Sequence, residues 1–462
     1  MFPKATLALL LAGAMILSQA LLAQTKNKQS DDRPNIILIL ADDMGRECLG
    51  TYGGTYPTPH LDQLAREGLK FNYGFSQPLC TPTRVQIMTG QYNYKNYVEF
   101  GYLDPYQKTF AHLAREAGYK TAIAGKWQLG ANNKLPGLFG FDQYCLWQLT
   151  YGKSKGERYA RPLIERDGEV VNSTDDDYGP DIFVNFLLDF ITKNKDNQFL
   201  AYYPMALVHA PFLPTPDSKS WNGQPAARHK NDTLNFRDMV AYCDKNVGKI
   251  VARLKELGLY ENTILVFTGD NGTGRPVVTP MKDGSQVRGG KGLTIDRGHH
   301  VPLIVNWGSG RYRKHVTDDL VDFTDILPTI ADVVHKKVPR EWQTDGHSIF
   351  PQIKGEKGTP RQWVFSHYNP LHSAGVNQQA ARFFRDHRYK LYQDGRFYDL
   401  EQDYEEQHPI ALGKGSTAAE TVRKRFTEEF AKLPSWKPGD PGQPKKIRPG
   451  YELQAGANEQ GE

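Results

Sequence analysis

The sequence predicts an α/β protein: a large, mostly parallel sheet flanked by helices, followed by a smaller antiparallel sheet with one helix. Apolar runs that favour strands alternate with helical patterns over about the first three-quarters of the 462 residues. The first run, Asn35 to Leu40 (NIILIL), is continuously apolar, which indicates a strand buried on both faces. The last quarter has shorter strand-like runs and a tight-turn pair, Asp394-Gly395, which favours antiparallel hairpins.

The elements of the larger unit follow from local patterns, taken in order along the chain. A helix is expected over 58–68, because Leu61, Leu64 and Ala65 recur at helical spacing before Gly68. The same reasoning predicts further helices at 107–118, 182–193, 233–259 and 325–335. Short apolar runs predict strands at 35–40, 119–124, 199–208, 263–267 and 301–307.

The smaller unit begins near residue 361. Strands are expected at 363–368, 381–392 and 396–400, and a helix at about 418–433. From Pro434 onward the chain is rich in proline, glycine and polar residues, which predicts a flexible tail over 435–462. The mature protein therefore divides into a main α/β domain over 24–360, an α+β subdomain over 361–434 and this tail.

The N-terminus has the pattern of a secretory signal peptide. Lys4 precedes an apolar run over 5–17, and small residues follow. The run is shorter than the roughly 20 residues that span a bilayer, and no later segment is long and apolar enough to do so. A signal peptide cleaved after about residue 23 predicts a secreted or periplasmic protein without a transmembrane segment.

Composition limits the class of protein. A hydrophobic content of 39% and a charged content of 24% fit a soluble globular chain, and a net charge of only +5 argues against nucleic-acid binding. The four cysteines (Cys48, Cys80, Cys145 and Cys243) form no CxxC motif, so a disulfide framework or zinc cage is not expected. One or two disulfide bridges among them remain open.

Acidic side chains follow two of the predicted strands. Asp42 and Asp43 come after the first strand, and Asp270 and Asn271 come after the strand at 263–267. Ligands gather at the carboxyl ends of strands in α/β sheets. Three carboxylates and one amide suit Ca²⁺ or Mg²⁺ rather than Zn²⁺. Either pair alone is more often a helix cap or a turn, but two such pairs favour a metal site.

Cys80 lies in the stretch PLCTPTRVQIMTGQY. Pro82 favours the first turn of a helix, so Cys80 is expected near its N-terminal end, where backbone N–H groups and the helix dipole favour an anion. Arg84 projects from the same helix face. Taken alone, a lone cysteine is more often a buried apolar residue, but this combination describes an oxyanion pocket.

These residues lie within a pattern that covers about residues 34–405. Cys80-Thr-Pro-Thr-Arg84, continued as Val-Gln-Ile-Met-Thr-Gly90, resembles the C-x-P-S/T-R-x-x-x-x-T-G signature of type I sulfatases. The blocks GKWQLG (125–130), HAP (209–211), FTGDNG (267–272) and GGKGLTIDRGHHVPLIVNW (289–307) resemble further blocks of that family, in the same order. The resemblance implies an alkaline phosphatase-like fold and a sulfuric ester hydrolase of the arylsulfatase type.

The resemblance also implies roles for particular residues. A formylglycine-generating enzyme would oxidise Cys80 to Cα-formylglycine, and one Ca²⁺ would be held by Asp42, Asp43, residue 80, Asp270 and Asn271. Catalysis would involve residue 80 as nucleophile with Arg84, Lys126, His209 and Lys291. Sulfate or substrate contacts would come from Lys126, Gln128, His209, Lys291 and His300. The implied substrate is a sulfated small molecule or, for an exported enzyme, a sulfated carbohydrate.

Gln128 departs from the family pattern, which has histidine in the corresponding GKWHLG block. Glutamine can donate or accept a hydrogen bond but cannot act as a base near neutral pH. Two alternatives therefore stand beside a sulfatase. One is a phosphatase or phosphodiesterase of the same superfamily, and the other is a sulfate-binding homologue with impaired turnover.

Overall fold

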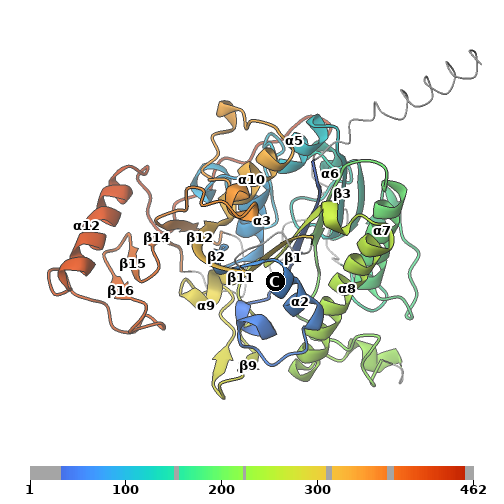
Figure 1. Ribbon diagram of the computed structural model, residues 1–462, viewed down its shortest axis with the longest axis horizontal. Coiled ribbons are helices and arrows are strands. Elements are labelled where there is room, and N and C mark those ends of the chain that lie inside the picture. Colours follow the sequence, from blue (N-terminus) through green and yellow to red (C-terminus); the bar gives the residue numbers. More distant parts are fainter. Residues whose placement is uncertain (1–32, 150–155, 222–224, 309–314, 372–378, 453–462) are drawn as a thin grey trace, which may run out of the picture.

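The computed structural model describes residues 33–149, 156–221, 225–308, 315–371 and 379–452. Its largest feature is a ten-stranded sheet in the spatial order β12-β2-β11-β8-β1-β7-β3-β4-β5-β6 (Figure 1). The strands of this sheet are β1 (Asn35–Ala41), β2 (Leu69–Phe75), β3 (Lys120–Lys126), β4 (Gln143–Trp147), β5 (Ile164–Arg166), β6 (Glu169–Val170), β7 (Phe199–Pro204), β8 (Thr263–Gly269), β11 (His300–Trp307) and β12 (Val316–Asp322). This is the large, mostly parallel sheet that the sequence predicts.

Strand direction brings several strand ends to one edge of the sheet. β1 is parallel to β7 and β8, and β3 is parallel to β7 and β4. β11 is antiparallel to both β8 and β2. Because two reversals restore the direction, β2 runs the same way as β8. The carboxyl ends of β2, β8, β1, β7 and β3 therefore lie along one edge, together with the first residue of β11.

Helices cover both faces of the sheet. Because side chains alternate along a strand, Ile37 and Ile39 of β1 point into one core, and Ile36 and Leu38 into the other. The first core is covered by α2 (Pro59–Glu67), α7 (Gly179–Lys193) and α8 (Phe236–Glu256). The second is covered by α3 (Cys80–Thr89), α5 (Phe110–Glu116) and α10 (Ile326–Val333). Shorter helices are α4 (Asn93–Asn96), α6 (Leu135–Leu138), α9 (Asp296–His299) and α11 (Phe350–Ile353).

The C-terminal quarter forms a separate four-stranded antiparallel sheet beside the main one (Figure 1). Its strands are β13 (Val364–Tyr368), β14 (Ala381–Arg385), β15 (Tyr389–Tyr392) and β16 (Phe397–Asp399). α12 (Thr417–Ala431) packs on it through Phe426, whose ring centroid lies 5.9 Å from that of Phe384. The single strand predicted over 381–392 is wrong: it is a hairpin, turned by Asp386, which accepts hydrogen bonds from the N–H groups of Arg388 and Tyr389.

Other strands escaped the sequence patterns. β2, β4 and β12 were not predicted, and β7 ends at Pro204 rather than continuing to 208. β12 (VTDDLVD) carries acidic residues because it lies at the edge of the sheet, where one side of the strand meets solvent. A small two-stranded sheet, β9 (Val278–Pro280) with β10 (Gln286–Arg288), lies outside the main sheet.

The stretch expected to be a tail runs back along the main domain as far as it is described. The N–H of Gln443 donates to the carbonyl of Tyr97 at 2.8 Å, and the Asn369 amide donates to the carbonyl of Asp440 at 3.2 Å. The predicted signal peptide lies outside the described residues. Within the described ranges, no helix combines the length and apolar character needed to cross a membrane.

Candidate active site

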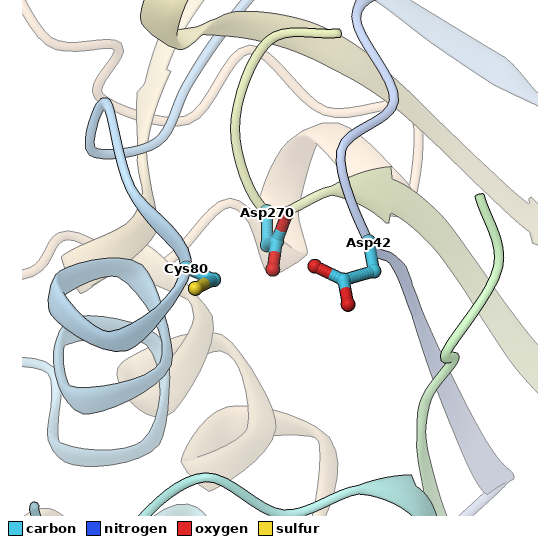
Figure 2. Close-up of side chains that lie close together, drawn as sticks. All are labelled: Asp42, Cys80 and Asp270. Atoms are coloured by element: carbon cyan, nitrogen blue, oxygen red, sulfur yellow. The ribbon is translucent and has the colours of Figure 1, made fainter. Parts of the chain in front are cut away.

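The predicted site residues come together because their strands end at the same edge. Asp42 and Asp43 follow β1, Asp270 and Asn271 follow β8, and Lys126 is the last residue of β3. Beyond β7 the chain continues to His209, and beyond β2 it reaches Cys80 at the start of α3. Figure 2 shows that the side chains of Asp42, Cys80 and Asp270 lie close together. Their potential ligand atoms all lie within 4.8 Å of one another.

The acidic residues are buried and tied to each other. Asp42, Asp270 and Asn271 have no solvent exposure, and Asp43 is 3% exposed. The backbone N–H of Asp43 donates to Oδ1 of Asp270 at 3.0 Å, and Nδ2 of Asn271 donates to Oδ1 of Asp43 at 2.8 Å. Asp43 has a left-handed backbone conformation, with φ of 58°. The two acidic pairs therefore form a single cluster.

Two buried cations neutralise part of this cluster. Nζ of Lys126 lies 2.9 Å from Oδ2 of Asp42. One guanidinium nitrogen of Arg84 donates to Oδ2 of Asp270 at 2.9 Å, and the same nitrogen lies 3.8 Å from Oδ1 of Asp42. The other terminal nitrogen of Arg84 donates to the carbonyl of Lys126 at 3.1 Å. Arg84 thus connects α3 to three strand ends.

The carboxylates differ in their affinity for protons. Burial alone would raise the pKa of Asp42, but the nearby Lys126, His209 and Arg84 hold it below its usual value. Burial, reinforced by the carboxylate of Asp42, raises the pKa of Asp270 to about 8 despite the contact with Arg84. A divalent cation among these groups would lower that pKa, because positive charge favours the ionised form.

Cys80 lies beside the acidic cluster, but its thiol does not ionise readily. It is the first residue of α3, all of whose residues are buried. The N–H of Gln77 donates to Oγ1 of Thr83, which donates to the carbonyl of Leu79 and so fixes the turn that precedes the helix. Burial raises the pKa of the Cys80 thiol to about 11, although Lys126 and Lys291 act in the opposite direction. Near neutral pH the side chain is therefore a protonated thiol.

His209 and Lys291 lie on the other side of Asp43. Nζ of Lys291 donates to Oδ2 of Asp43 at 2.9 Å and lies 2.8 Å from Nε2 of His209. Nδ1 of His209 contacts the carbonyl of Ala210, which can only accept a hydrogen bond. Nδ1 therefore carries the ring proton, and Nε2 accepts from the lysine. The pair holds a transferable proton beside the acidic cluster.

Two of the predicted site residues, Gln128 and His300, make no contact with the acidic residues in the hydrogen bonds described above. Gln128 follows β3 with φ of 52°, is 3% exposed, and neither atom of its amide has a hydrogen-bond partner among the described residues. His300 begins β11 but turns away from the cluster. Its Nε2 contacts the carbonyl of Asn72 at 2.7 Å, and its Nδ1 lies 3.6 Å from Oδ2 of Asp296.

Sequence reasoning missed Arg158. One of its terminal nitrogens lies 3.9 Å from Oδ2 of Asp42, and its guanidinium lies over the Trp147 ring, 4.1 Å from the centroid. The surrounding sequence, GERYARP, has no spacing that separates this arginine from a surface one. The contact depends on how the chain returns to the sheet after β4.

The donor set fits a hard cation. Oδ1 of Asn271 is buried and has no hydrogen-bond partner within the part of the chain that the structure describes, while its Nδ2 is engaged by Asp43. An amide oxygen left in this way beside three carboxylates matches the oxygen ligands of Ca²⁺ or Mg²⁺. The sulfur of an unmodified Cys80 would be a soft ligand in that set, and an oxygen at this position would fit better.

Comparison with known families agrees with this geometry. The model of the Sulfatase family matches residues 34–336. The chain belongs to the sulfatase family. A second family model, described as N-sulphoglucosamine sulphohydrolase, C-terminal, matches residues 290–435. The first match contains every residue of the cluster, and the second reaches from Lys291 through the C-terminal sheet.

Curated sulfatases resemble this chain over most of its length. It is 31% identical over 365 residues to an arylsulfatase of Hemicentrotus pulcherrimus, covering 72% of this chain and 64% of that protein. It is 27% identical over 378 residues to arylsulfatase J of Mus musculus, covering 75% of this chain and 60% of that protein. The chain thus spans less than two thirds of these two relatives.

Solved sulfatase structures share the fold. Ps i-CgsB in complex with k-i-k-neocarrahexaose superposes with a TM-score of 0.69 at 25% identity, over 87% of this chain and 92% of that one. BT4656, in complex with its substrate D-glucosamine-2-N,6-O-disulfate, gives the same TM-score at 21% identity, over 86% of this chain and 97% of that one. At that identity the second likeness concerns the fold alone.

Proposed function

We propose that this protein hydrolyses sulfate esters at the cluster around residue 80. One observation carries the proposal: a buried cysteine at a helix N-terminus faces an oxygen-rich cation site surrounded by Arg84, Lys126 and Lys291. Positive groups around a nucleophile stabilise the negative charge that develops on a reacting sulfate. The family supports the same reaction type.

The proposed metal ligands are Asp42, Asp43, Asp270 and Asn271, with residue 80 completing the protein's share. The family implies one Ca²⁺, which when bound would polarise the sulfate and favour the ionised form of the nucleophile. Arg84 fixes the carboxylate of Asp270, and hydrogen bonds from the Asp43 N–H and the Asn271 amide fix the positions of the cluster's residues. Little rearrangement is then needed to accept a cation.

Residue 80 is proposed to act as Cα-formylglycine, produced from Cys80 by a formylglycine-generating enzyme. Its hydrate would supply one hydroxyl to attack sulfur and a second to release sulfate, which an ordinary hydroxyl side chain cannot do. The high pKa of the Cys80 thiol argues against a thiolate nucleophile at this position. The arginine of the signature, Arg84, would then serve in maturation and afterwards in the site.

Lys126, His209 and Lys291 are proposed to bind the sulfate, and the His209–Lys291 pair to protonate the departing alcohol. The ammonium of Lys291 already donates toward Nε2 of His209, so one proton is shared within reach of the cluster. Transfer of that proton to the leaving oxygen would avoid a free alkoxide. Gln128, whose amide is buried and unpartnered among the described residues, is proposed to contact the bound group by hydrogen bonding alone.

The substrate is proposed to be a sulfated carbohydrate outside the cytoplasm. Support comes from relatives named for sugar sulfates, such as the N-acetylgalactosamine-6-sulfatase of Canis lupus familiaris, 29% identical over 385 residues. The apolar N-terminal run supports export through a cleaved signal peptide. His300, with both ring nitrogens engaged by Asn72 and Asp296, is proposed to act through these neighbours rather than by contacting the sulfate.

The test is turnover by protein co-expressed with a formylglycine-generating enzyme. We expect release of 4-nitrophenol from 4-nitrophenyl sulfate, loss of activity on chelation, and no turnover of 4-nitrophenyl phosphate. Mass spectrometry of the tryptic peptide 71–84 should show the aldehyde. Cys80→Ala should lose at least about 10³-fold in kcat, since the nucleophile is removed. Cys145→Ala, a buried cysteine elsewhere, is the control.

Three results would separate the alternatives. Preferred hydrolysis of the phosphate ester would indicate the phosphatase. Tight sulfate binding without turnover by aldehyde-bearing protein would indicate the binding homologue that Gln128 suggests. Full activity of Cys80→Ala would contradict the proposed mechanism.

A further inference from the structure

Arg158 is a cation that the proposed mechanism leaves unused. Its side chain is about nine-tenths buried, and it reaches Oδ2 of Asp42, the same oxygen that Nζ of Lys126 contacts. The two cations approach this oxygen from different parts of the chain: Lys126 ends β3, and Arg158 lies between β4 and β5. Arg158 therefore lies at the edge of the acidic cluster, on the side of Lys126.

Two sets of contacts hold Arg158 in place: one is made by its own guanidinium, and the other by the neighbouring residue Tyr159. Its guanidinium lies 4.1 Å above the Trp147 ring, and Trp147 is the strand partner of Lys126. The next residue, Tyr159, donates through its hydroxyl to the carbonyls of Ala206 and His209 at 2.7 and 2.6 Å. The hydrogen bonds of Tyr159 thus hold the segments of both His209 and Arg158. Arg158 is therefore a fixed, buried side chain rather than a mobile surface one.

The balance of charged side chains around Asp42 favours binding of an anion on this side of the site. Arg84, Lys126, Arg158 and Lys291 are four cations, against the three carboxylates of Asp42, Asp43 and Asp270. A bound Ca²⁺ would enlarge the positive excess. Burying such an excess is costly unless a negatively charged group completes the cluster. A sulfate group supplies that charge.

We propose that Arg158 is a further sulfate-binding residue, which donates to an oxygen of the reacting sulfate next to Lys126. A planar guanidinium presents paired donors that match the oxygens of such an oxyanion. This arginine thereby adds a charged contact in a site where Gln128, a neutral side chain, replaces the family histidine. The inference rests on the proposed function for the identity of the anion.

The experiment measures sulfate binding directly, without relying on turnover. Sodium sulfate is titrated calorimetrically into the mature, calcium-loaded protein at constant ionic strength, for the wild type, Arg158→Ala and Arg158→Gln. We expect the dissociation constant to rise about 10- to 100-fold in both variants, since a charge-assisted hydrogen bond is lost. Arg228→Ala is the matched control, because Arg228 also stacks on a tryptophan, 4.8 Å above Trp221, outside the cluster.

Kinetics with 4-nitrophenyl sulfate give a second readout. The loss in Arg158→Gln should appear mainly as a raised KM, because binding is weakened while the nucleophile is intact. Unchanged sulfate affinity in Arg158→Gln, or an equal loss in Arg228→Ala, would overturn the proposal. Arg158→Gln keeps three side-chain carbons and ends in a planar amide, so it is less disruptive than alanine and decides the question if the alanine variant does not fold. A different outcome is that sulfate binds and the binding depends on Arg158, but no sulfate ester is hydrolysed. That result would refute the proposed function and leave the role of Arg158 standing.

Discussion

At the scale of single residues, the contact between Lys291 and His209 bears on how the proposed reaction would protonate its leaving group. Nε2 of His209 accepts from the lysine, so the mobile proton belongs to the ammonium group. Asp43 accepts a hydrogen bond from the same ammonium group. In the proposed mechanism, the pair would therefore give up its proton from Lys291, with His209 orienting the ammonium group.

Replacing Lys291 should therefore affect poor leaving groups most. We expect Lys291→Ala to reduce kcat/KM about 10²- to 10⁴-fold on an alkyl or sugar sulfate, because general acid catalysis is lost. The reduction should be smaller on 4-nitrophenyl sulfate, whose phenolate departs without a proton. Lys282→Ala, an exposed lysine of the same region, should change neither. Equal losses on both substrates would show that Lys291 only binds sulfate.

The glutamine at position 128 leads to a prediction about how kcat depends on pH. Because a glutamine does not titrate, position 128 contributes no ionisation to the kcat profile of the wild type. Gln128→His should add one between about pH 5 and 8, the range in which histidine changes charge. Gln128→Asn serves as the non-titrating control. A kcat profile for Gln128→His that is superimposable on the wild-type profile would indicate that residue 128 does not contact the reacting group.

At the scale of an element, α5 begins with a pH-sensitive cap. The N–H of Thr109 donates to Nδ1 of His112 at 3.2 Å, and the Thr109 hydroxyl accepts from the N–H of Ala111. Burial, together with the charges of Lys108 and Arg115, lowers the pKa of His112 to about 4. A protonated Nδ1 could not accept the hydrogen bond, so the cap requires the neutral ring.

The sign of the pH effect follows from that lowered pKa. Between about pH 4 and 6.5 the unfolded chain binds more protons at this position than the folded chain, so stability rises with pH. The contribution of His112 is complete above pH 6.5 and is lost as the pH falls towards 4. Relative to wild type, His112→Gln should therefore flatten the fall in melting temperature over this range, since glutamine can cap without titrating. His408→Gln, at an exposed histidine, should leave the slope unchanged.

At the scale of the whole molecule, the C-terminal sheet holds the loop that carries Lys291. Arg385 of β14 donates to Oδ2 of Asp296 at 2.9 Å, and Lys390 of β15 donates to the carbonyl of Thr294. The Arg385 guanidinium also lies 4.4 Å above the Phe75 ring at the end of β2. The second sheet thus contacts both the Lys291 loop and the main sheet near the site.

Breaking this contact should reduce stability and activity together. Arg385→Ala leaves the buried carboxylate of Asp296 without its closest cation, so we expect a loss of about 3–5 kcal/mol in the free energy of unfolding. A lower kcat/KM should follow as Lys291 loses its position. Arg388→Ala, which breaks an ion pair that is 39% exposed on the arginine side, should cost no more than about 1 kcal/mol. Comparable losses in the two variants would contradict this role.

Much of the chemistry was accessible from local sequence. The run ending at Asp42-Asp43, the pair Asp270-Asn271 and the helix starting at Cys80 were each expected where the structure has them. The strands that were not predicted were β2, β4, β5, β6, β9, β10 and β12, and the turn within 381–392 was also missed. Their patterns are short, polar or interrupted, and pairing with distant strands stabilises them rather than local preference.

Local sequence was enough to give the family signature, the alternation of strands and helices, and the residue types at the candidate site. These are properties of short stretches, in which apolar spacing, prolines and glycines act on neighbouring residues. The folded chain was needed to see that Arg158 reaches Asp42, that His300 contacts Asn72 and lies near Asp296, and that the C-terminal sheet holds the loop of Lys291. The reason is that strand order brings together residues far apart in the chain, and local pattern does not specify that order.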